Sequence, residues 1–185
     1  MQTTIETTIT TFGKVTFEAK SVFGKLSAAQ LNWRPSSDKW SIAQCLDHLM
    51  VSNNTYIPQF DEVIAGKHSN SFYQNIRFIS KFFGEYLIRE TGPVVAKPMK
   101  NPPAFAPSQS EITATIVSDF EKHQQQFSAK LSQLSAIDLD KTVLSSPALG
   151  IITYTLRDLL TILSGHEQRH LNQAKNVLNH PNFPN

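Results

Sequence analysis

Two histidines four residues apart are the part of this sequence with the clearest chemistry. They lie in the string His166-Glu167-Gln168-Arg169-His170. In a helix, side chains at positions i and i+4 project from the same face, so two imidazoles can bind one metal ion. From the pair alone, two core histidines bonded to backbone or water are an equally good interpretation. Burying an imidazole without a hydrogen-bond partner costs free energy. Two imidazoles on one apolar face therefore suggest a partner that both of them share.

The same string fits H-E-x-x-H, the signature of zinc peptidases, in which the glutamate is the general base. Such enzymes need a third ligand, which usually lies downstream of the pair. No Asp or Glu follows Glu167, and the metzincin extension needs glycine and histidine where this chain has Gln173 and Asn176. His180 is out of register and precedes a proline. The sequence therefore disfavours a peptidase.

A third ligand can instead come from upstream. His48 lies in a predicted helix that begins near Ser41, one turn after Cys45 and at the edge of the apolar stripe. A residue at such an edge faces the seam between neighbouring helices. Taken alone, His48 is better explained as a half-buried packing residue than as a ligand.

Four long segments with apolar residues at steps of three and four predict an all-α fold, a four-helix bundle in a single domain over residues 1–185. Each segment begins with a capping-box pattern, which satisfies free backbone N–H groups at a helix start. The predicted starts are Thr3 with Glu6, Ser41 with Gln44, Ser108 with Glu111, and Thr155 with Asp158. The apolar stripes end near Leu26, Val63, Leu134 and Val177, and Pro58 interrupts the second. No convincing period-two strand pattern is present.

The connection over residues 67–107, between the second and third predicted helices, is much longer than the others. It contains an expected extra short helix near residues 73–89, which Gly92-Pro93 would end, and then a proline-rich stretch. Short loops make neighbouring helices antiparallel, whereas a long crossover allows them to run parallel. We therefore expect the second and third helices of the bundle to be parallel.

The composition restricts the function classes. Of the 185 residues, 40% are hydrophobic and 17% charged, and the formal net charge is only +2 without a run of Lys or Arg, so we expect no nucleic-acid partner. No apolar run approaches the ~18 residues that span a bilayer, so no membrane partner is expected. With one cysteine and no signal-peptide pattern at the start, the expected location is cytoplasmic.

Trp40-Ser41-Ile42 and Asp47-His48-Leu49, together with His166-x-x-x-His170, resemble the DinB/YfiT-like superfamily. The resemblance covers nearly the whole chain and extends to residues 31–35, the proline-rich stretch and residues 149–151. It implies a helical bundle with the long crossover, and a divalent metal ion held by His48, His166 and His170. Members of that superfamily include thiol-dependent S-transferases, such as bacillithiol transferases and mycothiol-dependent maleylpyruvate isomerases.

Three imidazoles with one open coordination position are typical of a catalytic metal site. Zinc or nickel is the expected ion, with manganese or iron as alternatives, because imidazole discriminates poorly among them. The first hypothesis is an S-transferase that activates a small thiol against a small electrophilic substrate. A hydrolase that uses metal-bound hydroxide is the second hypothesis. The third is a non-catalytic, metal-stabilised interaction module or homodimer, with aromatic residues of the crossover helix as the dimer surface.

The sequence does not identify catalytic residues other than the metal ligands. Glu167 and His123 are weak candidates. Glu167 points about 100° away from His166 around the helix, so a solvated charge is the simpler interpretation. Asp47, beside His48, has the same status. His123 lies on the apolar stripe of the third predicted helix, where core packing or substrate contact is favoured over a fourth metal bond. No site role is expected for three further residues, Cys45, His68 and His180.

Overall fold

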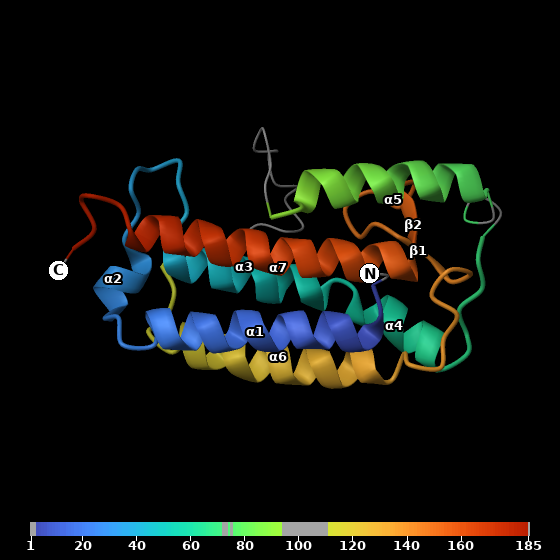
Figure 1. Ribbon diagram of the computed structural model, residues 1–185, viewed down its shortest axis with the longest axis horizontal. Coiled ribbons are helices and arrows are strands. Elements are labelled where there is room, and N and C mark those ends of the chain that lie inside the picture. Colours follow the sequence, from blue (N-terminus) through green and yellow to red (C-terminus); the bar gives the residue numbers. More distant parts are fainter. Residues whose placement is uncertain (1–2, 72–73, 75, 94–110, 185) are drawn as a thin grey trace.

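The computed structural model describes residues 3–71, 74, 76–93 and 111–184. The described chain is mostly helical, with one short antiparallel hairpin (Figure 1). In chain order the elements are α1 (Ile5–Phe23), α2 (Ala28–Asn32), α3 (Ile42–Asn54), α4 (Ile57–Ile64), α5 (Arg77–Thr91), α6 (Ile116–Ser132), β1 (Val143–Ser145), β2 (Thr153–Thr155) and α7 (Leu156–Leu178). Within these ranges, no helix is both long and apolar enough to cross a membrane.

Four long helices, α1, α3, α6 and α7, pack against one another and form the bundle. Figure 1 shows α1 and α7 running in one direction along the long axis of the molecule, and α3 and α6 running in the other. Both α1 and α3 contact α6 and α7. The expected parallel pair is therefore present as α3 and α6, and the all-α fold is confirmed.

The crossover contains the expected extra helix, α5, which packs on α7 and β2. It begins at Arg77, slightly later than predicted, and Gly92 ends it as predicted. The large side chains of Phe78 and Phe82 on this helix are exposed. The proline-rich stretch that follows lies outside the described residues.

Capping boxes begin three of the four bundle helices. Ser41 Oγ accepts a hydrogen bond from the Gln44 backbone N–H at 3.1 Å, and Thr155 Oγ1 accepts one from the Asp158 N–H at 3.0 Å, as predicted. At α1 the box is made by Thr4 and Thr7, so the predicted start at Thr3 was one residue early. These hydrogen bonds satisfy N–H groups that have no partner within the helix.

The predicted start of the third bundle helix was wrong. Ser108 lies outside the described residues, but residues 111–115 are not helical and α6 begins only at Ile116. The Asn32 side chain explains the delay, because it accepts a hydrogen bond from the Ile112 N–H at 2.8 Å and donates one to the Ile112 carbonyl at 2.7 Å. These bonds hold the Ile112 backbone outside the helix and replace its helical partners.

Two further predictions needed correction. The second predicted helix is two helices, α3 and α4, since Pro58 lies in the first turn of α4, where its missing N–H costs nothing. The expectation of no strands was also wrong, because β1 and β2 pair antiparallel with Leu144 opposite Tyr154. Each strand has three residues, too few for an alternating pattern to be visible in the sequence.

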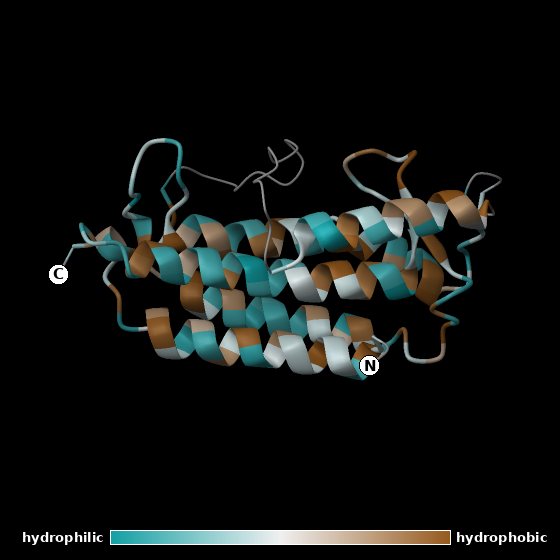
Figure 2. Ribbon diagram, turned by 45° about the horizontal axis from the view of Figure 1, so that its top comes forward, coloured by the Kyte–Doolittle hydropathy of each residue, from teal (hydrophilic) through white to brown (hydrophobic). Residues whose placement is uncertain are grey.

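The buried core consists of two apolar clusters with polar side chains between them. On α7, Leu163 belongs to one cluster and Leu171 to the other, and on α6 the same boundary falls between Phe127 and Phe120. Hydrophilic colours are visible in the middle of the helices (Figure 2). We call the buried polar side chains at this level the polar layer, and they are His48, Ser52, Asn53, Gln124, Glu167 and His170.

Candidate metal centre

The polar layer brings the three predicted ligands together from two helices. His48 lies on α3, and His166 and His170 lie one turn apart on α7, which packs against α3. Each offers a ring nitrogen, and these three atoms lie within 4.8 Å of one another. The Nε2 atoms of His48 and His166 are 3.0 Å apart. The three histidines therefore form a candidate metal site.

This arrangement fits a divalent ion. An ion that binds imidazole nitrogens at about 2.0–2.1 Å brings them to roughly 3–3.5 Å from one another, close to the spacing of His48 and His166. His170 Nδ1 is buried and has no hydrogen-bond partner among the described residues, which is unusual for a buried polar atom. The donor set, three imidazoles, suits zinc, nickel and related ions but does not select one of them.

The surroundings keep two of the three ligands, His166 and His170, neutral. Burial, reinforced by the neighbouring His48 and by Arg169, lowers the pKa of His166 well below its usual value. Burial also lowers the pKa of His170, and the two other histidines and Arg169 add to this effect. A neutral imidazole has a lone pair to donate, so at neutral pH these rings are ready to bind a metal ion.

Neighbouring side chains fix the orientation of the rings. The Trp40 ring lies 4.8 Å from the His48 ring and stacks on His170, with 5.6 Å between centroids. Ser52 Oγ is 3.4 Å from His48 Nδ1, the ring nitrogen that does not face His166. Partners of this kind orient metal ligands. His48 is 1% exposed and His170 5%, whereas His166 is half-buried, so solvent reaches the site at His166.

Comparison with known proteins identifies the family of this chain. The family model described as the DinB superfamily matches residues 16–174. The chain belongs to the DinB superfamily. This DinB chain is also similar to the uncharacterized protein YuaE of Bacillus subtilis (strain 168), with 24% identity over 172 residues, which cover 90% of this chain and 94% of YuaE. No solved structure matches significantly.

Glu167 is buried in this DinB domain, so the expectation of a solvated charge was wrong. Its side chain is fully buried, and its two carboxylate oxygens accept hydrogen bonds of 2.8 Å from Asn53 Nδ2 on α3 and Gln124 Nε2 on α6. Burial raises the pKa of Glu167 to about 7, although both hydrogen bonds oppose the shift. Because its oxygens are held by two amides inside the core, this carboxylate is poorly placed to act as a peptidase base.

His123 does not join the candidate metal site within the described ranges. Its Nε2 lies 3.0 Å from Asn54 Oδ1, and its ring stacks on Phe127. Burial lowers the pKa of His123 to about 4. Asp47, expected to be solvated, is instead buried beside His48.

The three residues without an expected role lie outside the ligand cluster. Cys45 is buried in the apolar core, and burial raises the pKa of its thiol. His68 Nε2 lies 3.1 Å from the Val143 carbonyl oxygen, and the His180 ring contacts Trp33.

Several residues that shape the site were not found from the sequence, namely Trp40, Ser52, Asn53, Gln124 and Arg169. Gln124 gave a usable signal, because it lies four residues after Phe120 and three before Phe127, both core positions. A polar residue at a core position of an amphipathic helix needs a buried partner. The identity of that partner, Glu167, depends on helix packing that no sequence pattern describes.

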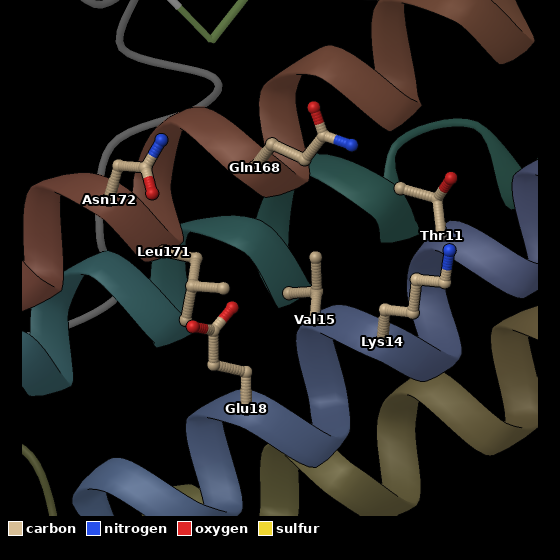
Figure 3. A pocket seen from close by; sticks show the side chains of 7 residues that line it. All are labelled: Thr11, Lys14, Val15, Glu18, Gln168, Leu171 and Asn172. Atoms are coloured by element: carbon tan, nitrogen blue, oxygen red, sulfur yellow. The ribbon is translucent and has the colours of Figure 1, made fainter.

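The outer side of α7 forms a groove with α1. Figure 3 shows its lining side chains, which come from α1 and α7 and are Thr11, Lys14, Val15, Glu18, Gln168, Leu171 and Asn172. None of the three histidines lines this groove. The groove is therefore separate from the ligand cluster.

Proposed function

We propose that this DinB protein is a metal-dependent S-transferase in which His48, His166 and His170 hold one divalent ion. The observation that supports it best is the ligand cluster itself, which consists of three imidazoles from two packed helices and includes no carboxylate or thiolate among the described residues. Three protein ligands leave a position for a further partner, as in catalytic rather than closed structural sites. When bound, the ion would lower the pKa of a thiol at that position.

The neutral ligand set favours a negatively charged nucleophile. Imidazoles do not neutralise a divalent ion, so its full positive charge acts on whatever occupies the open position. Two buried carboxylates lie next to ligands in the sequence, Glu167 and Asp47, and neither belongs to the ligand cluster. The oxygens of Glu167 are already occupied by Asn53 and Gln124. A thiolate would supply the missing negative charge.

The proposed reaction is a nucleophilic substitution or addition at carbon. The thiol loses its proton to solvent, and its sulfur electron pair forms a C–S bond with an epoxide, an activated halide or an α,β-unsaturated acid. With an activated halide, the electrons of the C–halogen bond leave with the halide ion. With an epoxide, the electrons of the broken C–O bond go to the oxygen, which then takes up a proton. With the unsaturated acid, the π electrons of the C=C bond move to the neighbouring carbon, which takes up a proton.

Metal binding is tested by tag-free purification and elemental analysis. We expect about one divalent ion per chain, and His170→Ala should weaken metal affinity more than about tenfold, because even the loss of an outer partner of a ligand costs that much. His180→Ala is the matched control, since His180 lies outside the ligand cluster, and it should retain the ion. Equal metal content in both variants would contradict the assignment.

Thiol activation is tested on the cobalt-substituted protein with a panel of small thiols and electrophiles. A thiol that binds the ion should change the cobalt absorption spectrum, and mass spectrometry should detect the thioether product with wild-type protein but not with His170→Ala. If no thiol changes the spectrum, the S-transferase proposal is wrong, and water is the remaining nucleophile.

A further inference from the structure

A guanidinium group lies beside the candidate metal site. Arg169 is three residues after His166 and directly precedes His170 on α7, and it is half-buried. Residues three apart on a helix are neighbours on one face, so Arg169 shares the solvent-accessible edge of the site with His166. Arg169 is also the residue directly before His170, so its backbone lies within one helical turn of both ligands.

The end of α5 holds Arg169 in place. Its Nη1 donates a hydrogen bond of 2.7 Å to the Glu90 carbonyl oxygen in the last turn of α5. The chain approaches closely here, since a Cβ on Gly165 would lie 3.2 Å from Gly92 Cα. One of five guanidinium N–H groups is used in this contact, and Glu90 is the one acceptor of Arg169 in the described part of the chain.

The charge of Arg169 is only partly balanced by a nearby carboxylate. Among the described residues Arg169 forms no direct ion pair, and Glu90, whose carboxylate does attract it, is paired with Arg89 Nε at 3.0 Å. Because Arg169 is half-buried, its charge is partly withdrawn from water. With a divalent ion bound to three neutral imidazoles, two adjacent positive centres would share this edge. Such a site needs an anion for compensation.

We propose that Arg169 determines substrate specificity by binding a carboxylate on the thiol substrate, an inference that rests on the proposed S-transferase function. The substrate is then a small thiol with a carboxylate near its sulfur, which binds with sulfur at the open metal position and carboxylate at Arg169. A planar guanidinium suits a carboxylate better than a lysine does, because it can donate two parallel hydrogen bonds.

The experiment compares two ligands that differ in charge but hardly in shape. The cobalt-substituted full-length protein is titrated with mercaptoacetate and with its neutral amide, mercaptoacetamide, and the absorption spectrum reports binding. Glycolate and glycolamide form a second pair without a thiol. A carboxylate can also bind the ion directly, so the decisive comparison is between wild type and Arg169→Gln, with Arg169→Lys as the conservative variant. Arg34→Gln, an exposed arginine outside the site, controls for the change in net charge.

Arg169→Gln should weaken mercaptoacetate binding by about tenfold or more, as expected for the loss of a charge-assisted hydrogen bond. Mercaptoacetamide binding should change by less than about twofold, Arg169→Lys should restore part of the preference, and Arg34→Gln should behave as wild type. If Arg169→Gln leaves the ratio of the mercaptoacetate and mercaptoacetamide affinities unchanged, the inference is overturned. Arg169 would then only hold α5 in place. If neither thiol binds, the S-transferase proposal fails, and the same ratio measured with glycolate and glycolamide still decides the role of Arg169.

Discussion

At the scale of single residues, the imidazole of His123 shows how strongly this core disfavours charge. The ring stacks on Phe127 at the edge of one apolar cluster, and its Nδ1 is buried without a partner among the described residues. Burial lowers its pKa from an ordinary value of 6.5 to about 4. The folded state therefore prefers the neutral ring, whereas the unfolded chain takes up a proton at higher pH.

The contribution of His123 to the stability of the metal-free protein should consequently fall as the pH drops from about 6.5 to about 4. In this window the unfolded state binds more protons at this ring, so the His123 contribution to the free energy of unfolding decreases by on the order of 1–3 kcal/mol after allowance for its partial exposure. His123→Gln should remove this contribution and flatten the pH dependence relative to wild type. Urea denaturation at pH 7.5 and 4.5 with a chelator measures the difference. Parallel losses of stability in the two proteins would show that His123 has no such role.

Roles of individual residues could be predicted where the pattern that reveals them spans only a few positions of the sequence. His166 and His170 were recognisable because one helix turn relates them, and His48 was assigned only through its resemblance to a family. The burial of Glu167 could not be predicted, because its hydrogen-bond donors come from α3 and α6, far away in the sequence.

At the scale of elements, hydrogen bonds within a few residues determined which helix starts were predictable. Ser41 and Thr155 were identified correctly because their capping partners lie three residues away. The start of α6 was missed because Asn32, a residue distant in sequence, binds the backbone of Ile112. The break between α3 and α4 is marked by Pro58, but whether a proline bends a helix or starts a new one is decided by packing.

The cap at the start of α7 offers a test of element stability. Thr155 accepts a hydrogen bond from the Asp158 N–H, and its hydroxyl donates to Asp158 Oδ2 at 2.7 Å. Thr155→Ala should lower the free energy of unfolding by about 1 kcal/mol, because the Asp158 N–H loses its capping partner. Thr10→Ala, on the exposed side of α1, is the control and should be neutral or slightly stabilising, since alanine is the better helix former. Chemical denaturation should separate the two variants, and indistinguishable midpoints would argue against the cap.

At the scale of the whole molecule, two apolar clusters on either side of the polar layer hold the bundle together. Both clusters include side chains from α1, α3 or α4, α6 and α7, so each joins the helices without the histidines. Burial of apolar surface is the main favourable term in folding, and the ion adds to it only by binding the folded state.

Removal of the metal should therefore leave the protein folded. Far-ultraviolet circular dichroism at 25 °C should show the same helical content with and without chelator, while Tm falls by several degrees because ligand-linked stabilisation is lost. His170→Ala should show the lower Tm in both conditions and no further response to chelator. A chain that unfolds when chelated would instead make the ion a structural element and contradict the enzyme proposal.

The polar layer also restricts how the helices can slide along one another. A displacement of α7 by one turn, about 5.4 Å, would bring Leu163 or Leu171 opposite Asn53 and Gln124 and leave the Glu167 carboxylate against apolar side chains. Polar groups buried between helices are known to fix helix register in this way, at a cost in stability. The hydrogen bonds of Glu167 thus select one alignment of α3, α6 and α7. That alignment brings together histidines that lie more than a hundred residues apart in the sequence.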